Sequence, residues 1–226
     1  MISATKETAL PANPGLLIFD LDGTLIDSSL DIAWCANGTL RAFGYAPKSV
    51  EYIKANIGWG VKMLLEKLMP GQSTEALTKA REKFLELYAR RLTVDTRLYP
   101  GVKDTLVVFA EKGKKMAIAT NKPEGLTKRI LDELGIGAYF CFVAGGDSFA
   151  NRKPHPEPLL KITDSLGVAL TDVIFVGDSP IDSEAGRNAG IFTVGVPYGY
   201  RGGTSIQDAG FDLIIKDFQS LMSIIE

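Results

Sequence analysis

The sequence is poor in the residue types on which many catalytic and structural sites depend. It contains only two cysteines, Cys35 and Cys141, and one histidine, His155. Two cysteines so far apart provide no disulfide framework, and we expect both to be reduced and buried as small apolar side chains. A single histidine, placed here between two prolines, disfavours zinc chemistry, a Ser-His-Asp triad and a histidine relay.

An excess of one charge and long apolar runs are also missing. The 25 basic and 27 acidic residues nearly cancel, whereas proteins that bind nucleic acid usually carry a clear basic excess. No stretch approaches the ~18 apolar residues of a membrane span, and residues 1–15 do not resemble a secretion signal. We therefore expect a cytoplasmic protein without nucleic-acid or membrane partners.

Short, continuous apolar runs indicate strands that are buried on both faces, as in a parallel sheet. The strongest runs lie at 16–19, 116–119 and 173–176, and weaker ones at 140–143, 192–196 and 213–215. Amphipathic segments that end at glycines separate them. From about residue 100 onward, this alternation of strand and helix predicts an α/β fold with a parallel sheet and right-handed crossovers.

Residues 28–97 break this alternation, because they contain no good strand. Apolar residues instead recur at helical spacing over 32–43, 61–68 and 76–87. Ser28 followed by Asp31 resembles a capping box at the start of the first of these helices. We interpret 28–97 as an all-helical lid inserted into a core domain formed by 1–27 and 98–226.

Polar side chains follow each of the three strongest runs. Asp20 and Asp22 follow the first, Thr120 and Asn121 the second, and Asp178 the third. Since ligands of open parallel sheets bind beyond the carboxyl ends of the strands, we expect these residues to share one site. Carboxylate oxygens suit a hard cation, and magnesium typically takes one or two carboxylates together with waters and phosphate oxygens.

Several common catalytic signatures are absent, which narrows the chemistry. The sequence has no GxSxG, GxxxxGK[ST] or GxGxxG motif, so it lacks the usual marks of hydrolases with a serine nucleophile, P-loop proteins and dinucleotide-binding proteins. Lys153, at the start of an expected helix, could bring an ammonium group to the site. What remains is nucleophilic catalysis by a carboxylate on phosphorus, assisted by magnesium and one lysine.

Four segments resemble, in order and spacing, the motifs of the haloacid-dehalogenase-like phosphatases. They are DLDGTLIDS at 20–28, TN at 120–121, KPHP at 153–156 and GDSPID at 177–182. Within that superfamily, LYPGV at 98–102, TNKP at 120–123 and NAG at 188–190 resemble the phosphoglycolate phosphatase group. The resemblance implies a Rossmann-like core whose helical insert is a cap of the C1 type.

The resemblance also implies roles for the acids. Asp20 would be the nucleophile that forms an aspartyl-phosphate, and Asp22 would protonate the leaving oxygen and later take a proton from water. Mg²⁺ would be held by the side chain of Asp20, the backbone carbonyl of Asp22 and the side chain of Asp178.

The remaining motif residues would support this reaction. Thr120 would bind the transferring phosphoryl group, and Lys153 would offset the charge of phosphate and carboxylates. Asp182 would orient Lys153 or a metal-bound water, and Asn121 would contact the substrate. In each case a plain structural role remains open, such as a turn for Thr120 or a helix start for Asp182.

Substrate choice is expected to lie in the helical insert, because the motifs describe only phosphate and metal. Gly58-Trp59-Gly60 lies where the resembling family carries its specificity loop. Trp59 would shrink the pocket or stack on a larger leaving group, and Lys62 or Lys54 would meet a substrate carboxylate. The alternatives are that Trp59 anchors the insert's own core and that the lysines are solvated.

These features predict a magnesium-dependent phosphomonoester hydrolase that is a monomer or a homodimer. Its predicted substrate is a small phosphorylated metabolite, and the favoured one is 2-phosphoglycolate. The same core on pyrophosphate, a nucleotide or a sugar phosphate is the nearest alternative. A β-phosphoglucomutase is less favoured, because the segment at 120–122 does not resemble the serine-rich motif of those mutases. A phosphate-binding regulator without catalysis is disfavoured, because the motifs together keep their acids and their lysine.

Overall fold

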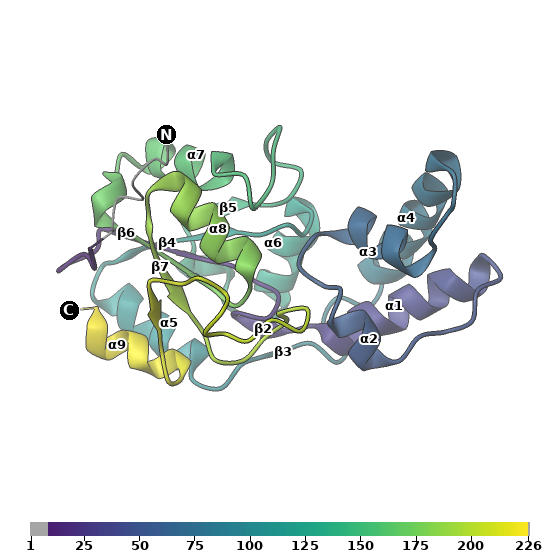
Figure 1. The fold of residues 1–226 in the computed structure, drawn as a ribbon. Coiled ribbons are helices and arrows are strands. Elements are labelled where there is room, and N and C mark those ends of the chain that lie inside the picture. Colours follow the sequence, from purple (N-terminus) through teal and green to yellow (C-terminus); the bar gives the residue numbers. More distant parts are fainter. Residues whose placement is uncertain (1–8, 226) are drawn as a thin grey trace, which may run out of the picture.

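A six-stranded parallel sheet organises the computed structural model, which describes residues 9–225. The strands run in the order β5-β4-β1-β6-β7-β8 (Figure 1). Their bounds are β1 Leu16–Phe19, β4 Lys115–Ala119, β5 Phe142–Ala144, β6 Val173–Gly177, β7 Phe192–Gly195 and β8 Leu213–Ile214. All six lie where the apolar runs predict strands, so the α/β fold with a parallel sheet is confirmed.

The register of the central strands determines where the polar residues emerge. Phe19 at the end of β1 lies opposite Ile118 of β4 and Val176 of β6. Because the three strands are parallel and end together, the residues that follow them leave the same edge of the sheet.

Helices cover both faces of the sheet (Figure 1). Side chains alternate along β1, so Leu17 and Phe19 join one core cluster and Leu16 and Ile18 the other. The first cluster includes residues of α5 (Val102–Glu111), α6 (Glu124–Glu133) and α9 (Leu221–Ile224). The second includes residues of α7 (Glu157–Leu166) and α8 (Pro180–Ala189). Short 3₁₀ turns lie at Gly137–Tyr139, Leu170–Asp172 and Phe218–Ser220.

Four helices lie beyond the carboxyl edge of the sheet (Figure 1). They are α1 Ser29–Ala42, α2 Val50–Lys54, α3 Val61–Leu68 and α4 Thr74–Ala89. The chain reaches them through β2 (Ile26–Asp27) and returns through β3 (Arg97–Leu98), which pair as a short antiparallel ribbon. Both crossings therefore run side by side, with Ile26 opposite Leu98. None of the helices in the described part of the chain is long and apolar enough to cross a membrane.

The start of α1 differs from the capping box that the sequence suggests. Ser28 makes no capping bond and donates its hydroxyl to Asp22 Oδ1 at 2.5 Å. Asp31 is fully buried, and its Oδ2 accepts the N–H groups of Asp95 and Thr96, each at 2.8 Å. The Asp31 carboxylate thus joins α1 to the returning crossing, a contact with a distant segment that local spacing does not reveal.

The expectation that both cysteines are buried is wrong for one of them. Cys35 is buried among the helices of the insert, but Cys141 is exposed. The reason is that β5, an edge strand of the sheet, begins at Phe142 rather than at residue 140. Cys141 therefore lies in the loop before the strand.

Candidate active site

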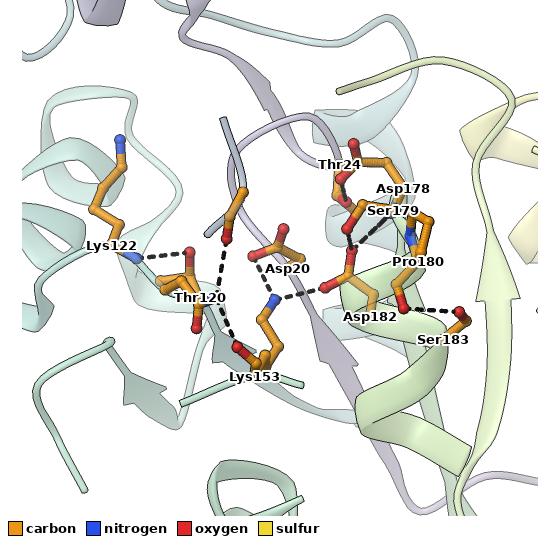
Figure 2. Close-up of polar contacts among 12 residues, drawn as sticks. Asp20, Thr24, Thr120, Lys122, Lys153, Asp178, Ser179, Pro180, Asp182 and Ser183 are labelled. Atoms are coloured by element: carbon orange, nitrogen blue, oxygen red, sulfur yellow. Dashed lines mark hydrogen bonds and ion pairs between the residues drawn. The ribbon is translucent and has the colours of Figure 1, made fainter. Parts of the chain in front are cut away.

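Asp20 and Lys153 form the centre of the site at the carboxyl edge of β1. Lys153 Nζ lies 2.8 Å from Asp20 Oδ1 and 2.7 Å from Asp182 Oδ1, and only 2% of the lysine side chain is exposed (Figure 2). Burial raises the pKa of Asp20 to about 6, although the Lys153 ammonium acts in the opposite direction. The structure thus brings together residues that lie far apart in the chain.

Asp182 is held by the start of α8. Its Oδ2 accepts the backbone N–H groups of Asp178 at 3.2 Å and Ser179 at 3.1 Å, as well as the Ser179 hydroxyl at 2.8 Å. Together with Ser179 it forms the capping box of this helix. Because its other oxygen pairs with Lys153, both oxygens of Asp182 are occupied. The geometry is that of a residue that positions the Lys153 ammonium.

Asp178 is enclosed by backbone and by one hydroxyl. Oδ1 accepts from Thr24 Oγ1 at 3.0 Å, and Oδ2 accepts from the N–H of Tyr200 at 2.5 Å. A Cβ at Gly23, where φ is +90°, would lie 2.5 Å from Asp178 Oδ2. Position 23 therefore requires glycine, both for its backbone conformation and for this close approach. Burial, followed by repulsion from Asp182 and Asp20, raises the pKa of Asp178 well above its usual range.

The three buried acids form a group with the composition of a cation site. Asp20, Asp178 and Asp182 each place a carboxylate oxygen within 4.8 Å of the others. Among them Lys153 supplies one positive charge, which leaves the group anionic. Asp182 accepts four hydrogen bonds, whereas each oxygen of Asp178 accepts one and, among the described residues, the Asp20 carboxylate contacts only Lys153. Asp20 and Asp178 are therefore the acids with more lone pairs to offer to a cation. Carboxylate oxygens without nitrogen or sulfur fit a hard divalent cation.

Asp22 belongs to a second polar group, on the side of the helical insert. Its Oδ1 lies 2.8 Å from Lys122 Nζ. Lys122 Nζ also donates to the hydroxyl of Tyr88, on α4, at 2.5 Å. Burial acts to lower the pKa of Lys122, but the contacts with Asp22 and Tyr88 together outweigh burial and raise it. The ammonium is therefore charged while almost fully enclosed.

The sequence alone does not distinguish Lys122 as a site residue. Its one signal is its place in the tripeptide TNK at 120–122, directly after Thr120 and Asn121. In Figure 2 its side chain extends away from Lys153, so the two ammonium groups serve different parts of the site.

Thr120 and Asn121 lie at the predicted edge of β4. Thr120 is buried, and its Oγ1 accepts the N–H of Lys122 at 3.3 Å. Asn121 Nδ2 donates to the carbonyl oxygens of Gly58 at 2.9 Å and Lys153 at 3.0 Å. Both amide protons are therefore used to join the loop at 58–60 to the loop that carries Lys153. Asn121 Oδ1 is buried and has no partner among the described residues, so it is the atom that Asn121 can offer to a ligand.

A small cavity separates the sheet edge from the helical insert. About 50 Å³ of it is open to the centre of a water molecule. Its polar lining comprises Asp20, Asp22, Thr120, Asn121, Lys122 and Tyr88. Its apolar lining comprises Ile32, Ile57, Val61, Leu64, Phe84, Pro123 and Leu126, with Gly58 and Gly60 at the loop. One wall thus carries the charges, and the other is largely hydrocarbon.

The structure does not bring Trp59 or Lys62 to this cavity. Trp59 is 39% exposed and lines a separate, open hollow with Arg152 and His155. The Lys62 side chain is 61% exposed, with Glu66 Oε1 at 3.9 Å. Lys54, the alternative predicted partner of a substrate carboxylate, instead lies 3.8 Å from Asp27 Oδ2 at the crossing into the insert. His155 is an exposed loop residue, as its neighbouring prolines predict.

Comparison with known proteins assigns the family. The model of the haloacid dehalogenase-like hydrolases matches residues 17–196. The chain is 36% identical over 215 residues to phosphoglycolate phosphatase 1 of Pseudomonas aeruginosa, covering 92% of this chain and 79% of that one. It is 35% identical to the phosphoglycolate phosphatase of Vibrio parahaemolyticus, covering 93% and 95% of the two chains.

A solved structure supports the same family assignment. A crystal structure described as a predicted phosphoglycolate phosphatase from Haemophilus somnus matches with a TM-score of 0.87 and 32% identity, covering 93% of this chain and 97% of the other. The chain therefore belongs to the haloacid dehalogenase-like hydrolases, the family that its four motifs resemble.

Proposed function

We propose that this protein is a magnesium-dependent phosphomonoester hydrolase whose substrate is 2-phosphoglycolate. The observation that carries the proposal is the buried acid group beside the small cavity, in which Asp20 contacts Lys153 and lies within reach of Asp178. The relatives named phosphoglycolate phosphatase support the choice of substrate, since they are similar over most of this chain.

Asp20 is the proposed nucleophile. Its carboxylate oxygen attacks phosphorus while the bond from phosphorus to the leaving oxygen breaks, and Asp22 gives that oxygen a proton. The products are glycolate and an aspartyl-phosphate on Asp20. A water that loses its proton to Asp22 then attacks phosphorus, which releases inorganic phosphate and restores both acids.

Other residues bind and orient the phosphoryl group. Thr120 donates its hydroxyl to a phosphoryl oxygen, and Lys153 offsets the negative charge that the phosphate brings beside Asp20. Asp182 keeps the Lys153 ammonium in place. The side chains of Asp20 and Asp178 and the backbone carbonyl of Asp22 would hold a magnesium ion. When bound, Mg²⁺ would supply positive charge that offsets the charge of the phosphate oxygens.

The segment 28–97 is the proposed cap over a core formed by 1–27 and 98–226. Its contacts with the core include Asn121 with Gly58 and Lys122 with Tyr88, which close the cavity on the insert's side. The paired crossings β2 and β3 offer a short hinge for opening. Closure protects a reactive aspartyl-phosphate from uncontrolled water, and opening releases the product.

The cavity favours a small leaving group over the alternatives. A nucleoside or a sugar brings many hydroxyl or ring polar groups, which would lose their water against the apolar residues of the insert. Glycolate brings two carbons and one carboxylate. The size and lining of the cavity therefore favour 2-phosphoglycolate over nucleotides and sugar phosphates.

A screen of some dozens of phosphometabolites, compared by kcat/KM, tests this proposal, with Asp20→Asn as the matched inactive control. We expect magnesium-dependent hydrolysis with 2-phosphoglycolate at the top of the ranking. A nucleotide, sugar phosphate or pyrophosphate preferred by tenfold or more would overturn the substrate. The absence of hydrolysis of every phosphate ester by magnesium-loaded protein would overturn the function.

A further inference from the structure

The cavity presents one cation on its inner wall. Among the described residues that line it, Lys122 is the only one with a positive charge. Lys153 does not line the cavity, and both of the acids that it contacts belong to the proposed phosphate and metal site. An anionic group on the leaving side of the substrate therefore has Lys122 as its one charged partner in this cavity.

The Lys122 ammonium has room for a further bond. An ammonium group carries three protons. Two of them have partners, Asp22 Oδ1 at 2.8 Å and the Tyr88 hydroxyl at 2.5 Å. No third acceptor contacts Nζ among the residues that the structure describes. The Lys122 side chain is only 5% exposed, so water competes little with a ligand for this proton.

The position of Lys122 beside Asp22 indicates which ligand group it meets. If Asp22 protonates the leaving oxygen, that oxygen lies within hydrogen-bond reach of the Asp22 carboxylate. In phosphoglycolate, one methylene separates the leaving oxygen from the carboxylate. The Lys122 ammonium, which contacts Asp22 directly, is therefore placed to meet the carboxylate of phosphoglycolate.

We propose that Lys122 binds the carboxylate of the leaving group and thereby selects phosphate esters of small 2-hydroxy acids, with Tyr88 of α4 positioning its ammonium. This inference rests on the proposed phosphatase function and specifies its substrate class. It assigns to Lys122 the contact that the sequence predicts for Lys62 or Lys54. The insert contributes through the Tyr88 hydroxyl, so the selecting cation is in place when the insert contacts the core.

The test compares 2-phosphoglycolate with ethyl phosphate, which has a methyl group in place of the carboxylate. For wild-type protein loaded with magnesium, we expect kcat/KM to be at least tenfold higher for phosphoglycolate. Lys122→Met should lower that preference by about 10- to 100-fold, in the range of a hydrogen bond to a charged group. Lys62→Met is the matched control from the insert, and it should leave the preference within twofold of wild type.

Tyr88→Phe provides a second variant in case Lys122→Met does not fold. It keeps the ring and removes the hydroxyl that holds the ammonium. We expect KM for phosphoglycolate to rise several-fold with a smaller change in kcat, and KM for ethyl phosphate to change less. Equal changes for both esters would show that Tyr88 has only a structural role and would contradict the positioning assignment.

The outcomes separate this inference from the proposed function. If wild-type protein hydrolyses neither these esters nor any other phosphate ester, the phosphatase proposal fails. If it hydrolyses both esters without preference, or if Lys122→Met loses activity equally on both, the inference alone fails. A selective loss in Lys62→Met would move the carboxylate contact to Lys62 and also overturn the inference.

Discussion

The two walls of the cavity differ in the polarity of their side chains. The sheet side presents the charged and polar side chains of Asp20, Asp22, Thr120, Asn121 and Lys122. The helical side is apolar except for Tyr88. We propose that the core performs the phosphate chemistry and that the insert limits which leaving group can enter.

The largest expected effect is at the nucleophile. Asp20→Asn should lower kcat on the order of 10⁴-fold, because loss of a covalent nucleophile removes the reaction path. Steady-state kinetics at saturating magnesium measures it. Retention of more than about a hundredth of wild-type kcat would rule out Asp20 as the nucleophile.

The same variant should not lose stability. Burial raises the pKa of Asp20 in the folded protein to about 6, above its ordinary value of 3.8. Ionisation of Asp20 therefore opposes folding, and its contribution to stability falls as pH rises between these two values. An uncharged Asn avoids this cost above pH 6. Thermal unfolding without added metal at pH 7.5 should show a Tm equal to or above that of wild type.

Removal of metal is the next largest perturbation on the core side. Chelator should abolish activity, magnesium should restore it, and calcium should inhibit, because its larger and looser coordination would misplace Asp20. Magnesium at about 100 times its Kd would add about 2.7 kcal/mol to stability, which raises Tm by about 5–10 °C in a chain of this size. Asp178→Ala should raise the magnesium requirement and reduce this thermal shift. Full activity in excess chelator would contradict the metal site.

Asp182→Ala should differ from Asp20→Asn by damaging the fold as well as the reaction. It removes the acceptor of two backbone N–H groups and a hydroxyl, and it deprives buried Lys153 of one of its two acids. We expect a loss of about 3 kcal/mol in the free energy of unfolding, measured by denaturant titration. Asp182→Asn, which keeps an oxygen acceptor, should lose less. Wild-type stability in Asp182→Ala would show that the carboxylate does not hold the start of α8.

The smallest expected effects lie on the helical side. Phe84→Leu should enlarge the cavity and shift the ranking of kcat/KM modestly, by about two- to fivefold, toward bulkier phosphate esters. Trp59→Ala, outside the cavity, should leave the ranking within about twofold. A larger shift in Trp59→Ala than in Phe84→Leu would support the sequence-based prediction that Trp59 sets the pocket size.

The core could be predicted from the sequence because its signals are local. A strand buried on both faces appears as a continuous apolar run, and the acids that follow it must emerge at the carboxyl edge. Asp20, Thr120 and Asp178 lie there for that reason. The contact of Lys153 with Asp20 follows from the family resemblance.

The helical side could not be predicted in the same way. Lys122 resembles an ordinary surface lysine in a loop, yet it is buried and contacts Tyr88 of a distant helix. Asp31 similarly reads as a first-turn acid, yet it serves the returning crossing at Thr96. Trp59 stands next to the right glycines, but tertiary packing directs its side chain to the outer hollow. Side-chain direction in loops depends on such contacts and not on spacing.

The most direct test of the account is a search for the covalent intermediate. Protein turning over 2-phosphoglycolate with magnesium is quenched in acid, digested and examined by mass spectrometry. The account predicts a phosphoryl group on the peptide that carries Asp20, located on that residue, and its absence from Asp20→Asn treated in the same way. A phosphoryl group on a different residue of the wild-type protein would contradict the account.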